Sequence, residues 1–167
     1  MEKQEIIISR DLADSLAQAL DRQSYDRLFV LTDTTTHRLC RPLLSGMKGM
    51  DDAWDIVIEP TDEHKDLHSL ASVWTALQEG GATRHSLMIN LGGGMVTDLG
   101  GFAASTFKRG IPYINIPPTL LSMVDASVGG KTGINYGGLK NEIGVFCPAR
   151  TVILSSRFLA SLDSRNL

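Results

Sequence analysis

Three consecutive glycines at residues 92–94 offer the clearest place for chemistry, because they join a predicted strand, SLMINL, directly to a helical pattern over residues 95–107. Glycines at such a turn let backbone N–H groups approach a pyrophosphate, and the helix N-terminus adds partial positive charge. The spacing is not GxGxxG, and residues 114–116, about 20 positions further on, hold no acid for a ribose. The pattern favours nucleotide binding and leaves a structural tight turn as the alternative.

Two aspartates could add contacts to a nucleotide. Asp98 falls in the first turn of the predicted helix, where its carboxylate could accept a hydrogen bond from a ribose or a nicotinamide, or interact only with the helix dipole. Asp33 ends the run RLFVLT, where it could hold ribose hydroxyls or cap the next helix, and the pattern alone favours the cap. Gly100 and Gly101 inside the helix predict close packing against a strand or a ligand, since each costs about 1 kcal/mol there.

A second set of polar residues lies between glycines in the segment VDASVGGKTGINYGGLKN, which holds Asp125, Lys131, Lys140 and Asn141. The GGKT stretch is similar to the end of a P-loop. However, the first glycine of that motif would fall on Asp125, and a predicted helix, TLLSMVDAS, precedes it where a strand is required, which excludes a P-loop. Two lysines beside glycine turns suit a phosphorylated ligand, with a solvated loop as the alternative.

Charge separates the two halves of the chain. Residues 1–80 hold 8 basic and 15 acidic side chains, whereas residues 81–167 hold 8 basic and 4 acidic ones. The second half therefore suits a small anionic ligand, and its basic residues form no stripe that predicts nucleic-acid binding. His64 and His68 have the i, i+4 spacing of a metal pair but no third ligand nearby, so no metal ligand is assigned in this chain.

The surrounding pattern predicts one α/β domain over residues 1–167. Strands are expected at residues 5–9, 27–32, 54–59, 86–91, 113–117 and 151–155. Helical spacing between these runs predicts a Rossmann-like, mostly parallel sheet with helices on both faces, whose ligands bind at the carboxyl ends of the strands. Two cysteines without a CxxC spacing and no apolar run long enough to span a bilayer predict a cytoplasmic protein that does not bind a membrane.

The segments GGGMVTDLGGFAASTFKRG, NIPPTLLSMVDASVGGKTGIN and GLKNEIGVF, with DEHK upstream, closely resemble the 3-dehydroquinate synthase family. The resemblance implies an NAD-dependent lyase of the shikimate pathway, which leads to the aromatic amino acids. Such an enzyme converts 3-deoxy-D-arabino-heptulosonate 7-phosphate, a phosphorylated sugar acid, into 3-dehydroquinate and phosphate. It also implies a divalent metal, zinc or cobalt, that polarises the reacting oxygens.

Matching positions imply the roles of individual residues. Candidate cofactor-binding residues, with Asp33 added from its place at a strand end, are Asp33, Asp62, Lys65, Gly93, Gly94, Val96, Thr97, Asp98, Thr119, Lys131, Lys140, Phe158 and Ser161. Candidate catalytic and substrate-binding residues are Asp125, Lys131, Asn141 and Arg109. The match at Arg109 is to an arginine that family dimers supply to the phosphate site of the neighbouring subunit, which implies a homodimer.

The sequence departs from the family pattern at three places. Pro118 replaces the first threonine of the usual PTT, Asp62 replaces a glutamate, and Asn166 stands where many members have a glutamate. The family's metal ligands lie in a helical C-terminal domain, which we expect beyond Leu167, so that the chain alone would bind NAD without completing turnover. Alternatives are another sugar-phosphate cyclase or a metal-dependent polyol dehydrogenase of the same superfamily, or a non-catalytic nucleotide-binding module.

Overall fold

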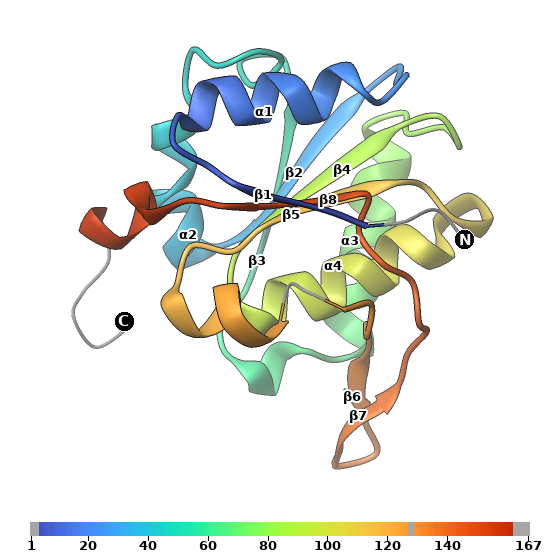
Figure 1. The fold of residues 1–167 in the computed structure, drawn as a ribbon. Helices are drawn as coiled ribbons and strands as arrows, with labels where there is room; N and C mark the ends of the chain where they lie inside the picture. Colours follow the sequence, from blue (N-terminus) through green and yellow to red (C-terminus); the bar gives the residue numbers. More distant parts are fainter. Residues whose placement is uncertain (1–3, 127–128, 162–167) are drawn as a thin grey trace.

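The computed structural model describes residues 4–126 and 129–161, and its centre is a six-stranded sheet in the order β1-β8-β5-β4-β2-β3 (Figure 1). All neighbouring strands in it are parallel. The strands are β1 (Glu5–Ile8), β2 (Leu28–Asp33), β3 (Trp54–Ile58), β4 (Leu87–Leu91), β5 (Tyr113–Ile116) and β8 (Thr151–Leu154). The six predicted strands are thereby confirmed, each within one residue at either end.

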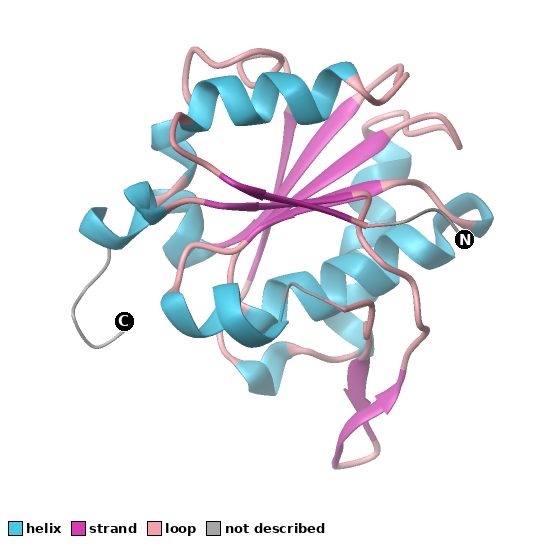
Figure 2. Cartoon of the chain, viewed as in Figure 1, coloured by secondary structure: helices cyan, strands magenta, loops and turns pink. Residues whose placement is uncertain are grey.

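Helices cover both faces of the sheet (Figure 2), which confirms the Rossmann-like arrangement. They are α1 (Leu12–Asp21), α2 (Thr34–Leu39), α3 (Leu67–Glu79) and α4 (Gly94–Thr106). Leu16 of α1 and Cys40 just after α2 belong to the core on one face, whereas Leu70 of α3 and Leu99 of α4 belong to the core on the other. All five residues of β4 are buried, because a central parallel strand is covered on both sides.

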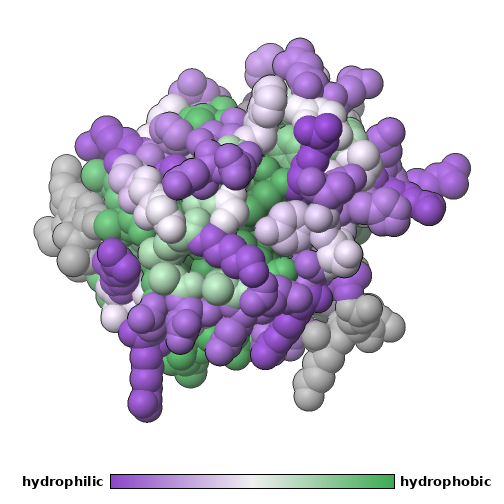
Figure 3. Space-filling model, turned by 90° about the horizontal axis from the view of Figure 1, so that it is seen from above, coloured by the Kyte–Doolittle hydropathy of each residue, from purple (hydrophilic) through white to green (hydrophobic). Residues whose placement is uncertain are grey.

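Helix α1 shows how the regular spacing of apolar residues places a helix against the sheet. Leu12, Leu16 and Leu20 face the sheet and are buried, while the opposite side of the helix is exposed. The Asp11 carboxylate accepts a hydrogen bond from the Asp14 N–H at 3.0 Å and so caps the helix. Seen from above, over α1, the surface is mostly hydrophilic (Figure 3).

Short helical turns complete the connections. They are η1 (Arg41–Leu44), η2 (Asp62–His64), η3 (Phe107–Arg109), η4 (Ser122–Ala126) and η5 (Ser156–Ser161). The predicted helix over TLLSMVDAS is confirmed for residues 120–126, where Leu120 and Leu121 are helical and the next five residues form the π-helical turn η4. No helix in the described ranges is long and apolar enough to cross a membrane.

An antiparallel hairpin extends away from the sheet (Figure 1). It consists of β6 (Ile134–Tyr136) and β7 (Leu139–Ile143), which the sequence analysis interpreted only as glycines and short turns. Gly137 and Gly138 join the strands with φ values of +61° and +80°, the left-handed conformation that two-residue hairpin turns require. The hairpin is the main element that the prediction lacked.

Candidate functional site

The glycine turn leaves open space at the start of α4. A Cβ on Gly92 would lie 2.5 Å from Cβ of Val96, so this glycine lets the chain turn closely against its own helix. A Cβ on Gly93 would meet no heavy atom within 4 Å. Gly93 is also the N-cap of α4 and provides no side-chain cap for the first N–H groups of the helix. A ligand can therefore approach these donors closely.

Two further glycines hold α4 tightly against the sheet. A Cβ on Gly100 would lie 2.2 Å from Oδ1 of Asn90, and one on Gly101 would lie 2.6 Å from Cγ2 of Thr132. Asn90 donates from Nδ2 to Oδ1 of Asn115 at 3.0 Å, so the two buried amides form a pair directly beneath the helix. The predicted close packing is thereby confirmed, and it fixes the N-terminus of α4 over the strand ends.

Asp33 lies at the carboxyl end of β2, next to the glycine turn that follows β4. The chain passes from β2 to α2 on one face of the sheet, and from the neighbouring strand β4 to α4 on the other face. Sheets of α/β proteins bind ligands at such a place, where connections from adjacent strands leave in opposite directions. Asp33 Oδ1 accepts from the Thr36 N–H at 2.8 Å, and Thr36 Oγ1 accepts from the Asp33 N–H at 3.1 Å. This capping box confirms that Asp33 caps α2.

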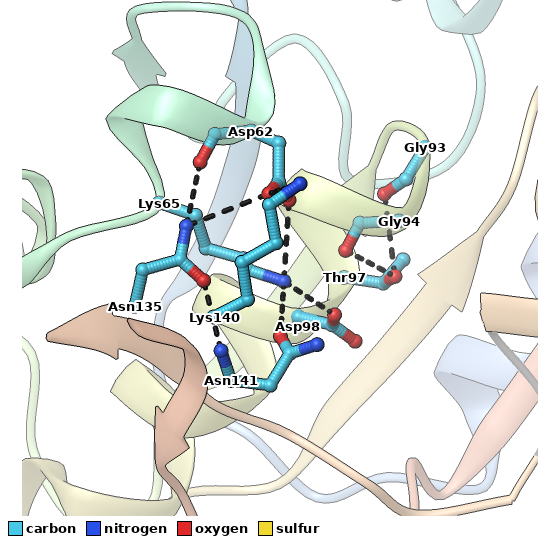
Figure 4. A network of polar contacts seen from close by, with 9 residues as sticks. All are labelled: Asp62, Lys65, Gly93, Gly94, Thr97, Asp98, Asn135, Lys140 and Asn141. Atoms are coloured by element: carbon cyan, nitrogen blue, oxygen red, sulfur yellow. Dashed lines mark hydrogen bonds and ion pairs between the residues drawn. The ribbon is translucent and has the colours of Figure 1, made fainter. Parts of the chain in front are cut away.

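Lys65 connects several candidate residues from distant parts of the chain (Figure 4). Its side chain is 4% exposed, and Nζ lies 3.1 Å from Oδ2 of Asp98, 3.3 Å from Oδ1 of Asp62 and 2.6 Å from Oδ1 of Asn141. An ammonium group has three N–H donors and here meets three acceptors. We call Asp62, Lys65, Asp98 and Asn141 the Lys65 cluster.

The pKa values of the two carboxyl groups in the Lys65 cluster are shifted in opposite directions. Burial raises the pKa of Asp98 above its ordinary value, although Lys65 opposes this effect. Burial would also raise the pKa of Asp62, but the charge and hydrogen bond of Lys65, a hydrogen bond from Asn135 and the charge of Lys140 together lower it. The charged form is thus stabilised more strongly at Asp62, the more exposed of the two aspartates, than at Asp98.

The hairpin forms the outer wall of this cluster. Asn135, which the sequence analysis missed, donates its backbone N–H to the Lys65 carbonyl oxygen at 2.7 Å, and Lys140 Nζ lies 3.8 Å from Oδ2 of Asp62. The Gly137–Gly138 pair between two short strand-like runs is the signal that could have revealed the hairpin, and with it the approach of Asn135 to Asn141.

A cleft of about 860 Å³ opens beside the cluster. It is lined by Asp98, Gly129, Gly130, Lys131, Thr132, Gly133, Asn141, Glu142, Gly144, Val145 and Phe146. Lys131 is exposed there, which leaves its ammonium group available to an anionic ligand. The structure therefore brings the predicted Lys131 and Asn141 to the same cleft as Asp98.

Other predicted residues lie apart from this region. Arg109 is exposed after the far end of α4, a helix of 13 residues and therefore about 20 Å long. Val96 and Phe158 are fully buried in the two cores, so their side chains do not face a ligand. Thr119 follows β5, and its hydroxyl lies 2.6 Å from Oγ of Ser122.

Two predicted site residues have side chains outside the described part of the structure, and His64 was considered as a metal ligand. The side chains of Asp125 and Ser161 lie outside the described residues. Nδ1 of His64 lies 2.8 Å from the Pro60 carbonyl oxygen and so already has a local partner. Within the described ranges, no three His, Cys, Asp or Glu side chains come together as metal ligands.

Comparison with known proteins adds to this geometry. Residues 55–167 match the model of the family described as 3-dehydroquinate synthase N-terminal. The whole chain is 50% identical to the 3-dehydroquinate synthase of Parabacteroides distasonis and covers 47% of that protein. The chain thus spans about half the length of the curated relatives it matches.

Solved structures share the fold over almost the whole chain. The 2-epi-5-epi-valiolone synthase of Streptomyces hygroscopicus subsp. jinggangensis, solved with NAD+ and Zn2+ bound, is 32% identical with a TM-score of 0.85, and the match covers 99% of this chain and 46% of that one. A 2-deoxy-scyllo-inosose synthase complexed with carbaglucose-6-phosphate, NAD+ and Co2+ has a TM-score of 0.80 at 22% identity, over 96% and 44% of the two chains. The family match and these relatives show that the chain belongs to the 3-dehydroquinate synthase family.

Proposed function

We propose that this chain is the NAD-binding part of a 3-dehydroquinate synthase, which converts 3-deoxy-D-arabino-heptulosonate 7-phosphate into 3-dehydroquinate and phosphate. The observation that carries the proposal is the open glycine turn at the start of α4, beside the Lys65 cluster. NAD bound there would supply reversible hydride transfer: oxidation of a ring CH–OH group to a ketone, with hydride leaving from the carbon and a proton from the hydroxyl, would acidify the neighbouring C–H before phosphate is eliminated, and the ketone would later be reduced again.

The residues at the carboxyl edge of the sheet fit a dinucleotide. The N–H groups at Gly93 and Gly94 would bind the pyrophosphate, because they lie at a helix N-terminus with open space above them. Asp33 would accept hydrogen bonds from ribose hydroxyls, because it lies at the end of β2, the strand next to β4. Asp98 and Lys65 would orient the rest of the cofactor from the side of α4.

The cleft beside the cluster suits a phosphorylated substrate. Lys131 would bind its anionic groups by charge-assisted hydrogen bonds, and Asn141 in the same cleft would orient its hydroxyls. By the family resemblance, Asp125 would help to orient these hydroxyls. We assign the zinc or cobalt ion no ligand among the described residues, since no suitable group of three side chains lies there. Because the chain spans about half the length of its curated relatives, we expect it to bind NAD without completing turnover by itself.

We further propose that the functional unit is a homodimer in which Arg109 reaches the phosphate site of a second copy. Lys108 and Arg109 both have left-handed backbones, with φ values of 51° and 67°, and both are exposed. Such strain in residues other than glycine often accompanies a function. Sedimentation at increasing concentration tests this, and a monomer throughout would contradict it.

A second candidate is another sugar-phosphate cyclase. The 32% identity and TM-score of 0.85 to a valiolone synthase favour it over the remaining alternatives. Release of phosphate from 3-deoxy-D-arabino-heptulosonate 7-phosphate, assayed with the complete enzyme that contains this chain, would support the first candidate. Absence of that release under conditions where another sugar phosphate reacts would support the second.

Calorimetric titration of NAD+ into the chain tests the cofactor site, with Gly93→Ala as the decisive variant. An alanine fits the fold at this position, because φ is −75° and its Cβ would meet nothing within 4 Å. Its methyl group would, however, occupy the space assigned to the pyrophosphate. We expect saturable binding that weakens about tenfold or more, the equivalent of roughly one good hydrogen bond.

The matched control is Gln78→Ala, an exposed position in the last turn of α3. This variant should bind NAD+ as the unchanged chain does. Equal affinity of the Gly93→Ala variant, or no binding by the unchanged chain, would contradict the proposed site.

A further inference from the structure

The β6–β7 hairpin has little apolar contact to hold it in place. Ile134 is its only buried residue among those described, and all five residues of β7 are exposed. Its position over the Asp62–Lys65 segment therefore depends on specific polar contacts. Asn135 makes most of these contacts (Figure 4).

Asn135 uses its backbone N–H, its side-chain oxygen and its side-chain nitrogen at once. The backbone N–H donates to the Lys65 carbonyl oxygen at 2.7 Å. Nδ2 donates to the Asp62 carbonyl oxygen at 2.9 Å and lies 3.5 Å from Oδ2 of the same residue. Oδ1 accepts from the Asn141 N–H at 2.9 Å. One residue thus connects the two strands of the hairpin to the segment that carries Lys65.

The geometry of β6 makes this possible. The pairing of β6 with β7 is irregular between Ile134 and Tyr136, which is where Asn135 lies. Ile134 pairs with Ile143 and Tyr136 with Leu139, so the extra residues of the irregularity lie on β7. Asn135 lies between the two paired residues of β6, and its backbone N–H points away from β7 to the carbonyl oxygen of Lys65, on a different element.

The contact with Asn141 has a direct effect on the Lys65 cluster. Asn141 has φ +53°, a left-handed conformation that asparagine adopts more readily than most residues but that still needs support. The hydrogen bond from its N–H to Asn135 provides that support. In this conformation Oδ1 of Asn141 lies 2.6 Å from Nζ of the buried Lys65.

We infer that Asn135 is a positioning residue, which sets the place of the Lys65 ammonium through Asn141 without touching the ligand itself. This inference rests on the proposed NAD site, because Lys65 and Asp98 are among its residues. Asn135 does not line the cleft and contacts it only through Asn141, which agrees with an indirect role.

The first test is a double-mutant cycle on NAD+ affinity. Asn135→Ala should weaken binding about tenfold, since it removes the hydrogen bonds that orient Asn141. Asn141→Gly keeps the left-handed backbone free of strain and removes the Lys65 contact. In that background, Asn135→Ala should change the affinity by less than about twofold, because its effect passes through Asn141. The same factor in both backgrounds would indicate a merely structural role and overturn the inference.

The second test needs no ligand, so it separates the inference from the proposed function. Hydrogen exchange of the Lys65 ammonium, followed by 15N NMR, should be faster in Asn135→Ala than in the unchanged chain. Tyr136→Thr is the matched control, because this neighbouring residue is exposed and threonine keeps the strand preference. An unchanged exchange rate in Asn135→Ala would overturn the inference. Failure of the unchanged chain to bind NAD+ would contradict only the proposed function.

Discussion

The turn at the start of α4 and the β6–β7 hairpin both carry candidate ligand contacts, but different forces hold them in place. The turn lies between the fully buried strand β4 and a helix packed so closely that Gly100 leaves no room for a Cβ. The hairpin is mostly exposed, and polar contacts to Asp62 and Lys65 attach it to the domain.

Because packing holds the turn and polar contacts hold the hairpin, mutations in these two parts of the site should have different effects. Apolar packing is dense and tolerates almost no added volume, but it depends little on pH. Hydrogen bonds and ion pairs can be altered singly, and they depend on the charge of each partner. We therefore expect mutations beneath the turn to act on stability, and mutations at the hairpin to act mainly on ligand affinity.

The largest effect is expected from Gly100→Ala. The added Cβ would lie 2.2 Å from the buried Oδ1 of Asn90, so either α4 or the Asn90–Asn115 pair must move. We expect a loss of about 3 kcal/mol in the free energy of unfolding, measured by urea denaturation. Gly93→Ala, which meets nothing within 4 Å, should change it by less than about 1 kcal/mol. Equal effects of the two variants would show that packing does not hold the turn.

A smaller loss is expected from Lys65→Met. The methionine fills a similar volume but leaves Asp98 and Asp62 without their shared cation. Removal of one partner from a buried pair is costly, and partial exposure of both carboxylates reduces the cost here to about 2 kcal/mol. Lys131→Met, at an exposed lysine of the cleft, is the control and should change stability by less than about 0.5 kcal/mol. Similar losses in both variants would contradict the structural role of Lys65.

The smallest effect concerns the opposite pKa shifts of Asp62 and Asp98. NMR titration of the carboxyl groups should place the midpoint of Asp62 below 3.8 and that of Asp98 above it. Asp62 then contributes stability above pH 3.8 that is lost as the pH falls through its folded pKa. Asp98 acts with the opposite sign, since its contribution is present below pH 3.8 and is lost as the pH rises through its folded pKa.

Asp62→Asn tests the stability side of this comparison. It should cost about 0.5 kcal/mol near neutral pH, the size of a half-exposed ion pair, and nothing at a pH below the folded midpoint of Asp62. A cost that does not change with pH would mean that the charge of Asp62 is not what stabilises the fold.

The buried framework could be predicted from the sequence because its signals are local. Apolar runs such as LFVL and YINI have the length and composition of parallel strands, and the helices between them have regular apolar spacing. The glycine turn was equally visible, as strand, glycines and helix follow one another directly. Asp33 was correctly interpreted as a cap because capping depends on its immediate neighbours.

The hairpin side of the site was harder to predict, because its contacts join residues far apart in the chain. The contact between Lys65 and Asn141 spans 76 positions, and no local pattern specifies it. Asn135 carries no charge, and although it ends the segment GGKTGIN, no role was predicted for it. The resemblance named Lys65, Lys140 and Asn141, but only the structure shows the contacts that connect them.

An NMR titration of the 15N-labelled chain with NAD+ tests most directly whether the glycine turn holds the cofactor. The account predicts the largest shifts at the amides of Gly93, Gly94 and Met95, at the start of α4. The amides of Leu12 and Ala13 should stay unchanged, because they start helix α1, which also follows a strand but is capped by the Asp11 side chain. Shifts centred on other residues, with Gly93 and Gly94 unmoved, would contradict it.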